Sequence, residues 1–244
     1  MKVTIAYIEE PPFGWSEPDG TATGADLDLA ESLLHAIGVT RIDYRPTTFS
    51  ELLPGVAAGR WDMNVPLFVT PERATMVSFS LPVWAIGDGF LIRTGNPKGL
   101  FSYESLATHP NARLGIIAGQ VQHESARAAG VAEEQIVIFD RQADAIEAVC
   151  SGAIDAYAST AVGNRIVADR SGGSVEAVDH PERQCPPTGA YSFNKSNGDL
   201  MRRINEQLRL YLGSADHRAR MAKFGITHRE IDPALAAARH EKGR

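Results

Sequence analysis

The sequence predicts an α/β protein of two lobes, and three observations lead to that prediction. Short runs rich in β-branched residues alternate with helical periodicities along the chain, which is typical of sheets flanked by helices. The alternation begins again after residues 87–96, so a second unit is expected there. A proline-rich stretch at residues 178–193 interrupts it before a last helical segment, which indicates a return to the first unit.

The first unit is expected to begin with a strand at Lys2–Tyr7, followed by a loop rich in proline and glycine. Residues 26–39 then have helical spacing, with Asp26 as the expected N-terminal cap and Gly38 as the end. The next elements are a strand at 41–46, a helix at 49–59 and a strand at 61–69. This order predicts a mostly parallel sheet with helices on both faces.

The second unit repeats the alternation, and the chain then ends in helix. We expect strands at 112–119, 135–140 and 153–159, with helices at 120–130, 141–152 and 160–169. Residues 197–214 have apolar side chains at helical spacing, namely Leu200, Ile204, Leu208 and Leu212. The predicted lobes are residues 1–88 with 186–244, and residues 89–185, joined by crossings near 86–92 and 181–190.

Composition narrows the function classes. The 244 residues are 43% hydrophobic and 22% charged, which are ordinary proportions for a globular chain, and no run is long enough for a membrane-spanning helix, so a soluble protein is expected. The formal charge of -6 gives no general attraction to nucleic acid or anionic lipid. Cys150 and Cys185 lack metal-site spacing; either one disulfide or two inert buried thiols fits them.

Common catalytic signatures are absent from the sequence. It contains no G-x-S-x-G elbow, no P-loop and no G-x-G-x-x-G, and "HESAR" lacks the second histidine of a zinc protease. Cys150 lies in an amphipathic helical pattern, which favours a buried structural thiol over a nucleophile. The chemistry that remains is binding, without a cofactor or metal.

An arginine in the segment "TPER" is the first candidate for a binding residue. Thr70 can cap a short helix with Pro71 as its first residue, at the end of a predicted strand, where open α/β sheets bind ligands. Arg73 is suited to bind a carboxylate through two parallel hydrogen bonds. The alternative is a surface arginine paired with Glu72.

Two loops supply further candidates. Glu10, Phe13 and Trp15 lie between a strand end and a helix start, and a carboxylate beside aromatic rings suits a cationic or zwitterionic ligand. The alternative is that both rings close the core and Glu10 is solvated. Gly119 turns a strand into a helix whose first N–H groups could receive an anion, although a plain structural turn has the same pattern.

Taken together, these segments resemble the family 3 solute-binding proteins, the amino-acid-type receptors of bacterial ABC importers. The similarity extends over nearly the whole chain, and it rests on the order and spacing of its pieces. They are "PPFGW", "TGADLDLAESLLHAIG", "FSELLPGVAAGRWDM", "VTPERATMVSFSLPVW", "LGIIAGQVQHE" and "AVCSGAIDAYAS".

The resemblance implies the type II periplasmic-binding-protein fold, with two mixed sheets flanked by helices and two hinge strands, closing over a ligand. It also implies a monomer that works with ABC permease subunits in the periplasm or anchored to the outer face of a membrane, with a leader preceding the given residues. By position, Arg73 would bind the ligand carboxylate, and Phe49 and Phe13 would pack against the ligand. Gly119 to Val121 would offer backbone N–H groups.

Departures from the family pattern bear on the ligand. Val65, Pro66 and Phe68 replace residues that commonly make polar contacts, and Pro66 has no backbone N–H to donate. Thr160 stands where the family has an aspartate that binds the ligand's amino group. Losing one such charge-assisted hydrogen bond costs about 1.5–3 kcal/mol, so an ordinary α-amino acid is disfavoured.

Glu10, Phe13 and Phe68 are instead similar to residues of the branch that binds ectoine-like compatible solutes, where aromatic rings help to build a cage. The resemblance therefore implies a compact ligand with a carboxylate and a delocalised or alkylated cation.

Two other functions are compatible with the same scaffold. One is an enzyme similar to cyclohexadienyl dehydratase, which would need a general acid near residues 159–165, where this chain has no carboxylate. The other is the ligand-sensing domain of a receptor.

Overall fold

The computed structural model describes residues 1–180 and 186–240 of the chain. They fall into two compact units, the first comprising residues 1–86 and 186–240 and the second residues 87–180. The predicted crossing near 181–190 lies partly outside the described residues.

The first unit is built on a sheet with strand order β4-β1-β5-β13-β6, and β7 also pairs with β13. The strands are β1 (Lys2–Tyr7), β4 (Arg41–Pro46), β5 (Met63–Phe68), β6 (Ser78–Phe79), β7 (Trp84–Ala85) and β13 (Thr188–Phe193). β1 is parallel to β4 and β5, as the strand–helix order predicts. β13 is antiparallel to β5, β6 and β7, because it enters the sheet from the second unit rather than through a crossover helix. The sheet is therefore mixed, and the expectation of a mostly parallel sheet is wrong at β13.

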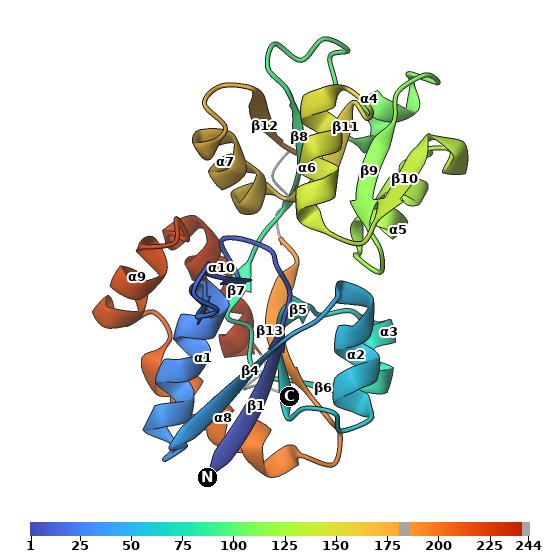
Figure 1. Cartoon of the computed structure of the whole chain (residues 1–244). Helices are drawn as coiled ribbons and strands as arrows, with labels where there is room; N and C mark the ends of the chain where they lie inside the picture. Colours follow the sequence, from blue (N-terminus) through green and yellow to red (C-terminus); the bar gives the residue numbers. More distant parts are fainter. Residues whose placement is uncertain (181–185, 241–244) are drawn as a thin grey trace. The chain divides into compact units, whose positions relative to one another are not determined.

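Helices cover both faces of this sheet, with α1, α8 and α9 on one face and α2 and α3 on the other (Figure 1). Their bounds are α1 (Ala25–Ala36), α2 (Phe49–Ala57), α3 (Pro71–Met76), α8 (Gly198–Tyr211), α9 (Ala215–Ala222) and α10 (His228–His240). A short ribbon of β2 (Trp15–Ser16) and β3 (Ala22–Thr23) precedes α1. In α8 the predicted apolar positions Leu200, Ile204 and Leu208 are buried, and Leu212, directly after the helix, is half-buried.

The start of α1 differs from the prediction. The residue before its first turn is Gly24, at φ 132°, and no side chain caps the helix. A Cβ at Gly24 would lie 2.3 Å from the carbonyl oxygen of Phe13, so the close approach of two backbones requires glycine there. Asp26 lies inside the first turn instead of capping it, and it is buried. Gly38, at φ 83°, follows the end of the helix as predicted.

A bulge explains how β5 accommodates Pro66 between two neighbouring strands. The register between β5 and β13 shifts between Ala190 and Ser192, so that Val65 and Pro66 lie opposite Tyr191 alone. The Tyr191 N–H donates to Ser80 Oγ at 3.1 Å instead of to β5. The missing donor of Pro66 is therefore placed where the ladder is already interrupted.

The second unit has a five-stranded mixed sheet with order β10-β9-β11-β8-β12. Its strands are β8 (Asp88–Arg93), β9 (Leu114–Ile117), β10 (Ile136–Phe139), β11 (Ala156–Thr160) and β12 (Val175–Asp179). Its helices are α4 (Tyr103–Ala107), α5 (Gln122–Ala128), α6 (Gln142–Ser151) and α7 (Ala161–Arg170), with a 3₁₀ turn at Glu133–Gln135. β9 is parallel to β10 and β11, whereas β8 is antiparallel to β11 and β12. The predicted strands and helices of this unit are all found.

Cys150 is exposed on α6 with a free thiol, so the prediction that it is buried is wrong. Ala145 and Val149 form the buried stripe of this helix, and the residue after Val149 is turned about 100° away from it. Cys185 lies outside the described residues. Within those residues, no helix has the length and apolar character needed to span a bilayer, and no group of His, Cys, Asp or Glu could hold a metal ion.

Candidate functional site

Arg73 lies in the short helix that the sequence predicts after β5. Thr70 Oγ1 accepts a hydrogen bond from the Arg73 N–H at 3.1 Å, and Pro71 is the first helical residue. This turn directs the guanidinium inward: only 7% of the residue is exposed, and Nη1 donates to the carbonyl oxygen of Phe68 at 3.0 Å. Burial lowers the pKa of the guanidinium to about 10, so Arg73 is still a full cation at neutral pH.

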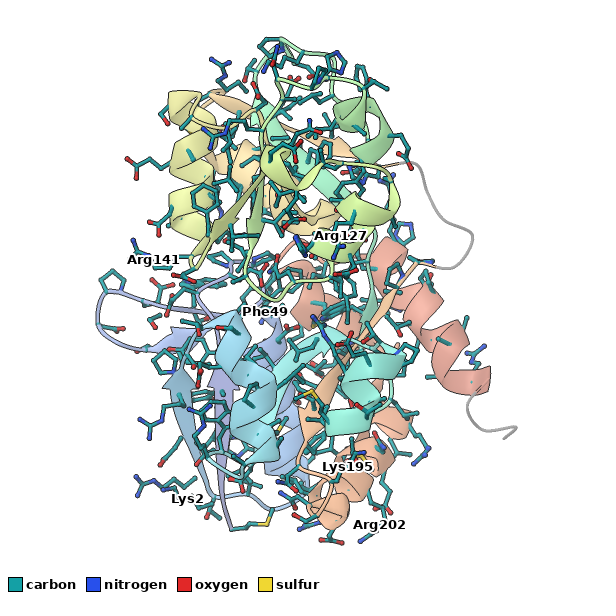
Figure 2. The ribbon with its side chains drawn as sticks, turned by 90° about the vertical axis from the view of Figure 1, so that its right-hand side faces the viewer. Lys2, Phe49, Arg127, Arg141, Lys195 and Arg202 are labelled. Atoms are coloured by element: carbon teal, nitrogen blue, oxygen red, sulfur yellow. The ribbon has the colours of Figure 1, made fainter. Side chains whose placement is uncertain are left out.

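Phe49, the first residue of α2, presents its ring to this cation (labelled in Figure 2). The Cζ atom of Arg73 lies 5.4 Å from the centre of the Phe49 ring, a cation–π distance. Leu52 and Val56, one and two turns further along α2, are buried in the core beneath Phe49. The helix thus anchors the ring while leaving it half-buried.

Three buried aromatic side chains, Phe13, Phe68 and Trp84, pack together in the first unit, and we call them the aromatic cluster. The Trp84 ring meets Phe68 edge-on at 5.2 Å and Phe13 at 5.8 Å with a 44° tilt. Gly189 on β13 makes room for Trp84, because a Cβ there would lie 2.1 Å from the indole ring. Phe68 also supplies the carbonyl that binds Arg73, so the cation lies directly beside the cluster.

The loop after β1 holds Glu10 and Phe13 in a tight turn. Glu10 and Gly14 form an isolated antiparallel bridge, and the Phe13 N–H donates to the Glu10 carbonyl at 2.9 Å. The neighbouring Glu9 carboxylate accepts from both the N–H and the hydroxyl of Ser16, which closes the turn. The loop is therefore fixed by its own hydrogen bonds.

Of the two aromatic residues predicted in this loop, only Phe13 joins the cluster. Trp15 packs edge-on against Phe224 at 6.2 Å, and its indole N–H donates to Glu17. A chain of contacts therefore runs from Phe13 through Trp84 to Phe68, Arg73 and Phe49, and Glu10 is hydrogen-bonded to Phe13 through the backbone. Pro66 contributes the bulge two residues before Phe68.

Two residues of this arrangement were not predicted as site residues: Trp84, and Asp26, which was expected only as a helix cap. Trp84 joins the predicted Phe13 to the predicted Phe68, and its indole N–H donates to Asp26 Oδ1 at 3.1 Å. Burial raises the pKa of Asp26 well above its ordinary value, and the nearby charge of Glu10 adds to that rise, while the Trp84 hydrogen bond opposes it. The only sequence signal was local: Trp84 ends the "FSLPVW" segment and Asp26 begins the "DLDL" run.

The three candidates in the second unit lie at turns of its sheet. Gly119, at φ 81°, follows β9, and Val121 precedes α5 without a side-chain cap. The intervening Gln120 N–H donates to the Ile117 carbonyl at 3.1 Å, so this one of the three expected N–H groups is used within the turn. Thr160 Oγ1 accepts from the Gly163 N–H at 3.2 Å and caps α7. Ligand contact by these residues stays a prediction from the sequence.

Asp88, the first residue of β8, is a carboxylate beside Thr160 that was not predicted from the sequence. Asp88 pairs with Thr160 across the β8–β11 ladder. Its carboxylate accepts from Tyr103 Oη at 3.1 Å and from Gln122 Nε2 at 2.8 Å. The His180 ring packs edge-on against Tyr103 at 4.7 Å. This edge of the sheet is polar although Thr160 is uncharged.

Comparison with known proteins gives a consistent set of relatives. A sequence profile described as "Bacterial extracellular solute-binding proteins, family 3" matches residues 3–224. The "Probable amino-acid ABC transporter periplasmic-binding protein y4tE" of Sinorhizobium fredii is 35% identical over 214 residues, covering 84% of this chain and 71% of that protein. "Arginine-binding protein ArgT" of Corynebacterium glutamicum is 23% identical over 231 residues, covering 92% and 74%. The solved structure of EhuB in complex with hydroxyectoine has a TM-score of 0.87 at 25% identity, covering 96% of this chain and 91% of that one.

Proposed function

Because this chain belongs to the bacterial extracellular solute-binding proteins, family 3, we propose that Arg73, Phe49, Glu10 and the aromatic cluster form the first unit's part of its ligand site. The family and the two-lobe type II fold predicted from the sequence are both confirmed. The chain has a substrate-binding role for a small solute, as its relatives do.

The observation that carries the proposal is the buried guanidinium of Arg73 beside Phe68 and Phe49. A guanidinium held at a fixed place by the Phe68 carbonyl presents a planar, permanently charged fork. A ligand carboxylate matches that fork and gains strength from the low local dielectric. We therefore assign the ligand an anionic carboxylate that pairs with Arg73.

The aromatic rings and Glu10 define the other end of the ligand. Aromatic faces bind a delocalised or alkylated cation by about 0.5–2 kcal/mol each, and a carboxylate adds charge pairing. Thr160, by contrast, is neutral and its oxygen caps α7, which disfavours a primary ammonium at that position. A compact zwitterion with a charge-delocalised cation fits both ends, and hydroxyectoine, the ligand of EhuB, has this chemistry.

Binding rather than catalysis is the proposed role, and the segment at residues 159–165 supports it. There Thr160 caps α7, and Asn164 Nδ2 donates to the Gly89 carbonyl at 2.9 Å. Arg165 pairs with Asp179 at 2.5 Å. The segment thus offers no carboxylic acid for a dehydratase. Incubation with arogenate or prephenate should leave both compounds unchanged, and formation of the aromatic product would contradict this part of the proposal.

A thermal-shift screen tests the ligand class. A ligand that binds only the folded state raises the unfolding midpoint according to the ratio of its concentration to its Kd. We expect hydroxyectoine, ectoine or a betaine to raise the midpoint of the wild-type chain more than L-arginine or L-glutamine does. Tight binding of a common amino acid, with no response to ectoine-type or betaine-type solutes, would overturn the assignment.

We also propose that the chain acts as a monomer outside the cytoplasmic membrane, in the periplasm or anchored to a membrane, and delivers its ligand to ABC permease subunits. Membership of the extracellular family supports this location. Cell fractionation tests the location, and ligand uptake in a strain lacking the gene tests the delivery: retention in the cytoplasm, or unchanged uptake, would count against them.

A further inference from the structure

Asp26 makes three hydrogen bonds in the first unit, and two of them are with residues of the aromatic cluster. Its carboxylate accepts from the Trp84 indole at 3.1 Å, and its backbone N–H donates to the Phe13 carbonyl at 3.0 Å. Its own carbonyl accepts from the Tyr191 hydroxyl at 2.7 Å. Only 1% of the residue is exposed. One residue in the first turn of α1 therefore bonds the Trp84 ring directly and the backbone of Phe13.

The ordinary roles of a first-turn acid do not account for this placement. Asp26 does not cap α1, since the residue before the helix is Gly24. A favourable interaction with the helix dipole needs no burial, and Asp28 in the same turn already supplies one from a half-buried position. Asp28 instead pairs with Arg220 of α9 at 2.7 Å. Burying a carboxylate costs free energy, so a second acid placed under the cluster calls for a specific partner.

That partner is the indole, whose single polar atom is a donor. With Nε1 bonded to Asp26, the Trp84 ring has one orientation about its side-chain bonds. This orientation gives the 86° contact with Phe68 and the 44° contact with Phe13. The same aspartate fixes Phe13 from the backbone side.

We propose that Asp26 is a positioning residue of the ligand site, holding Trp84 through its carboxylate and Phe13 through its backbone so that both rings are preset for the ligand. This role rests on the proposed function, because it takes the aromatic cluster to be a ligand-contacting surface. Ligand binding should then be sensitive to Asp26 although the residue itself is covered.

The first measurement needs no ligand. The chain has three tryptophans, so a ¹⁵N–¹H NMR spectrum contains three indole signals, and Trp84→Phe identifies the one that belongs to Trp84. Asp26→Ala should move or broaden the Trp84 signal and leave those of Trp15 and Trp61, which donate to Glu17 and Asn64. Asp26→Asn, which keeps an acceptor oxygen, should give a smaller shift and serves alone if Asp26→Ala does not fold. Asp28→Ala, the matched change in the same turn, should leave the Trp84 signal in place.

The second measurement is the Kd for hydroxyectoine by calorimetry. Asp26→Ala should weaken binding about tenfold, a typical loss for one aromatic contact. Asp26→Asn should keep most of the wild-type affinity. Asp28→Ala should bind as the wild type does. In a Trp84→Phe background, Asp26→Ala should cause little further loss of affinity, because Asp26 acts on the ligand through Trp84.

Several results would overturn the proposal. An unmoved Trp84 signal would exclude the contact, and an equal loss of affinity with and without Trp84 would exclude action through the indole. If the wild-type chain binds neither hydroxyectoine nor any other compound of the screen, the proposed function fails and the ligand role of Asp26 with it. If the Trp84 signal still depends on Asp26 in that case, the contact between the two residues is present and the proposed function alone is wrong.

Discussion

Replacing Arg73 with methionine should separate ligand binding from stability. In the free protein the buried charge is costly: the fall in pKa from 12.5 to about 10 corresponds to roughly 3 kcal/mol at 1.36 kcal/mol per tenfold change. The hydrogen bond to the Phe68 carbonyl offsets about 1.5–3 kcal/mol of this cost. The contact with the Phe49 ring offsets a further part of it. Methionine keeps the length of the side chain without charge. We therefore expect the free energy of unfolding of Arg73→Met to lie within about 1 kcal/mol of the wild type.

Binding should respond quite differently. A ligand carboxylate loses two charge-assisted hydrogen bonds in Arg73→Met, which predicts at least an approximately 100-fold increase in Kd. Arg73→Lys keeps the charge but not the planar fork, so its loss should be intermediate. Calorimetry with hydroxyectoine gives the Kd, and urea unfolding of the free protein gives the free energy of unfolding. A Kd within threefold of the wild type, or a loss of stability above about 3 kcal/mol, would refute this reasoning.

Three further predictions concern residues other than Arg73. Burial lowers the pKa of His217 to about 4, below its unfolded value of 6.5, so its contribution to stability is complete above pH 6.5 and is lost as pH falls toward 4. Between pH 7 and pH 4.5, the free energy of unfolding in urea should fall by about 2–3 kcal/mol more for the wild type than for His217→Asn. An equal fall in the two proteins would contradict this prediction. Gly189→Ala should displace the Trp84 ring and weaken ligand binding measured by calorimetry, whereas Gly198→Ala, at the start of α8 with open space around it, gives the control. Thr160→Val removes the cap of α7 and should lower the free energy of unfolding in urea by about 1 kcal/mol; an unchanged value would show that the cap contributes nothing.

Locally encoded features were predictable from the sequence. The cap by Thr70 and the first-turn proline at Pro71 are adjacent, so propensity and turn chemistry suffice to place them, whereas the inward position of Arg73 was one of two alternatives. The alternating strands and helices of the two units were predictable in the same way, from side-chain periodicity.

Features that depend on distant partners were not predictable. Trp84 meets Asp26 across 58 residues of chain, and its space depends on Gly189 in a strand that returns from the second unit. Asp26 looked like a helix cap because aspartate favours that position, but the backbone contact between Gly24 and Phe13 starts the helix earlier. Cys150 was misplaced because one residue along a helix turns the side chain out of the buried stripe.

The central claim is that Arg73 binds the carboxylate of a ligand whose cation lies against the aromatic cluster. A crystal structure of the chain with hydroxyectoine, or with whichever screened compound raises the unfolding midpoint most, tests it directly. We predict two carboxylate oxygens at hydrogen-bonding distance from the Arg73 guanidinium, with the cationic group against Phe13, Phe68 and Trp84. A ligand carboxylate bound elsewhere, with the rings of the cluster out of contact with the ligand, would contradict the account.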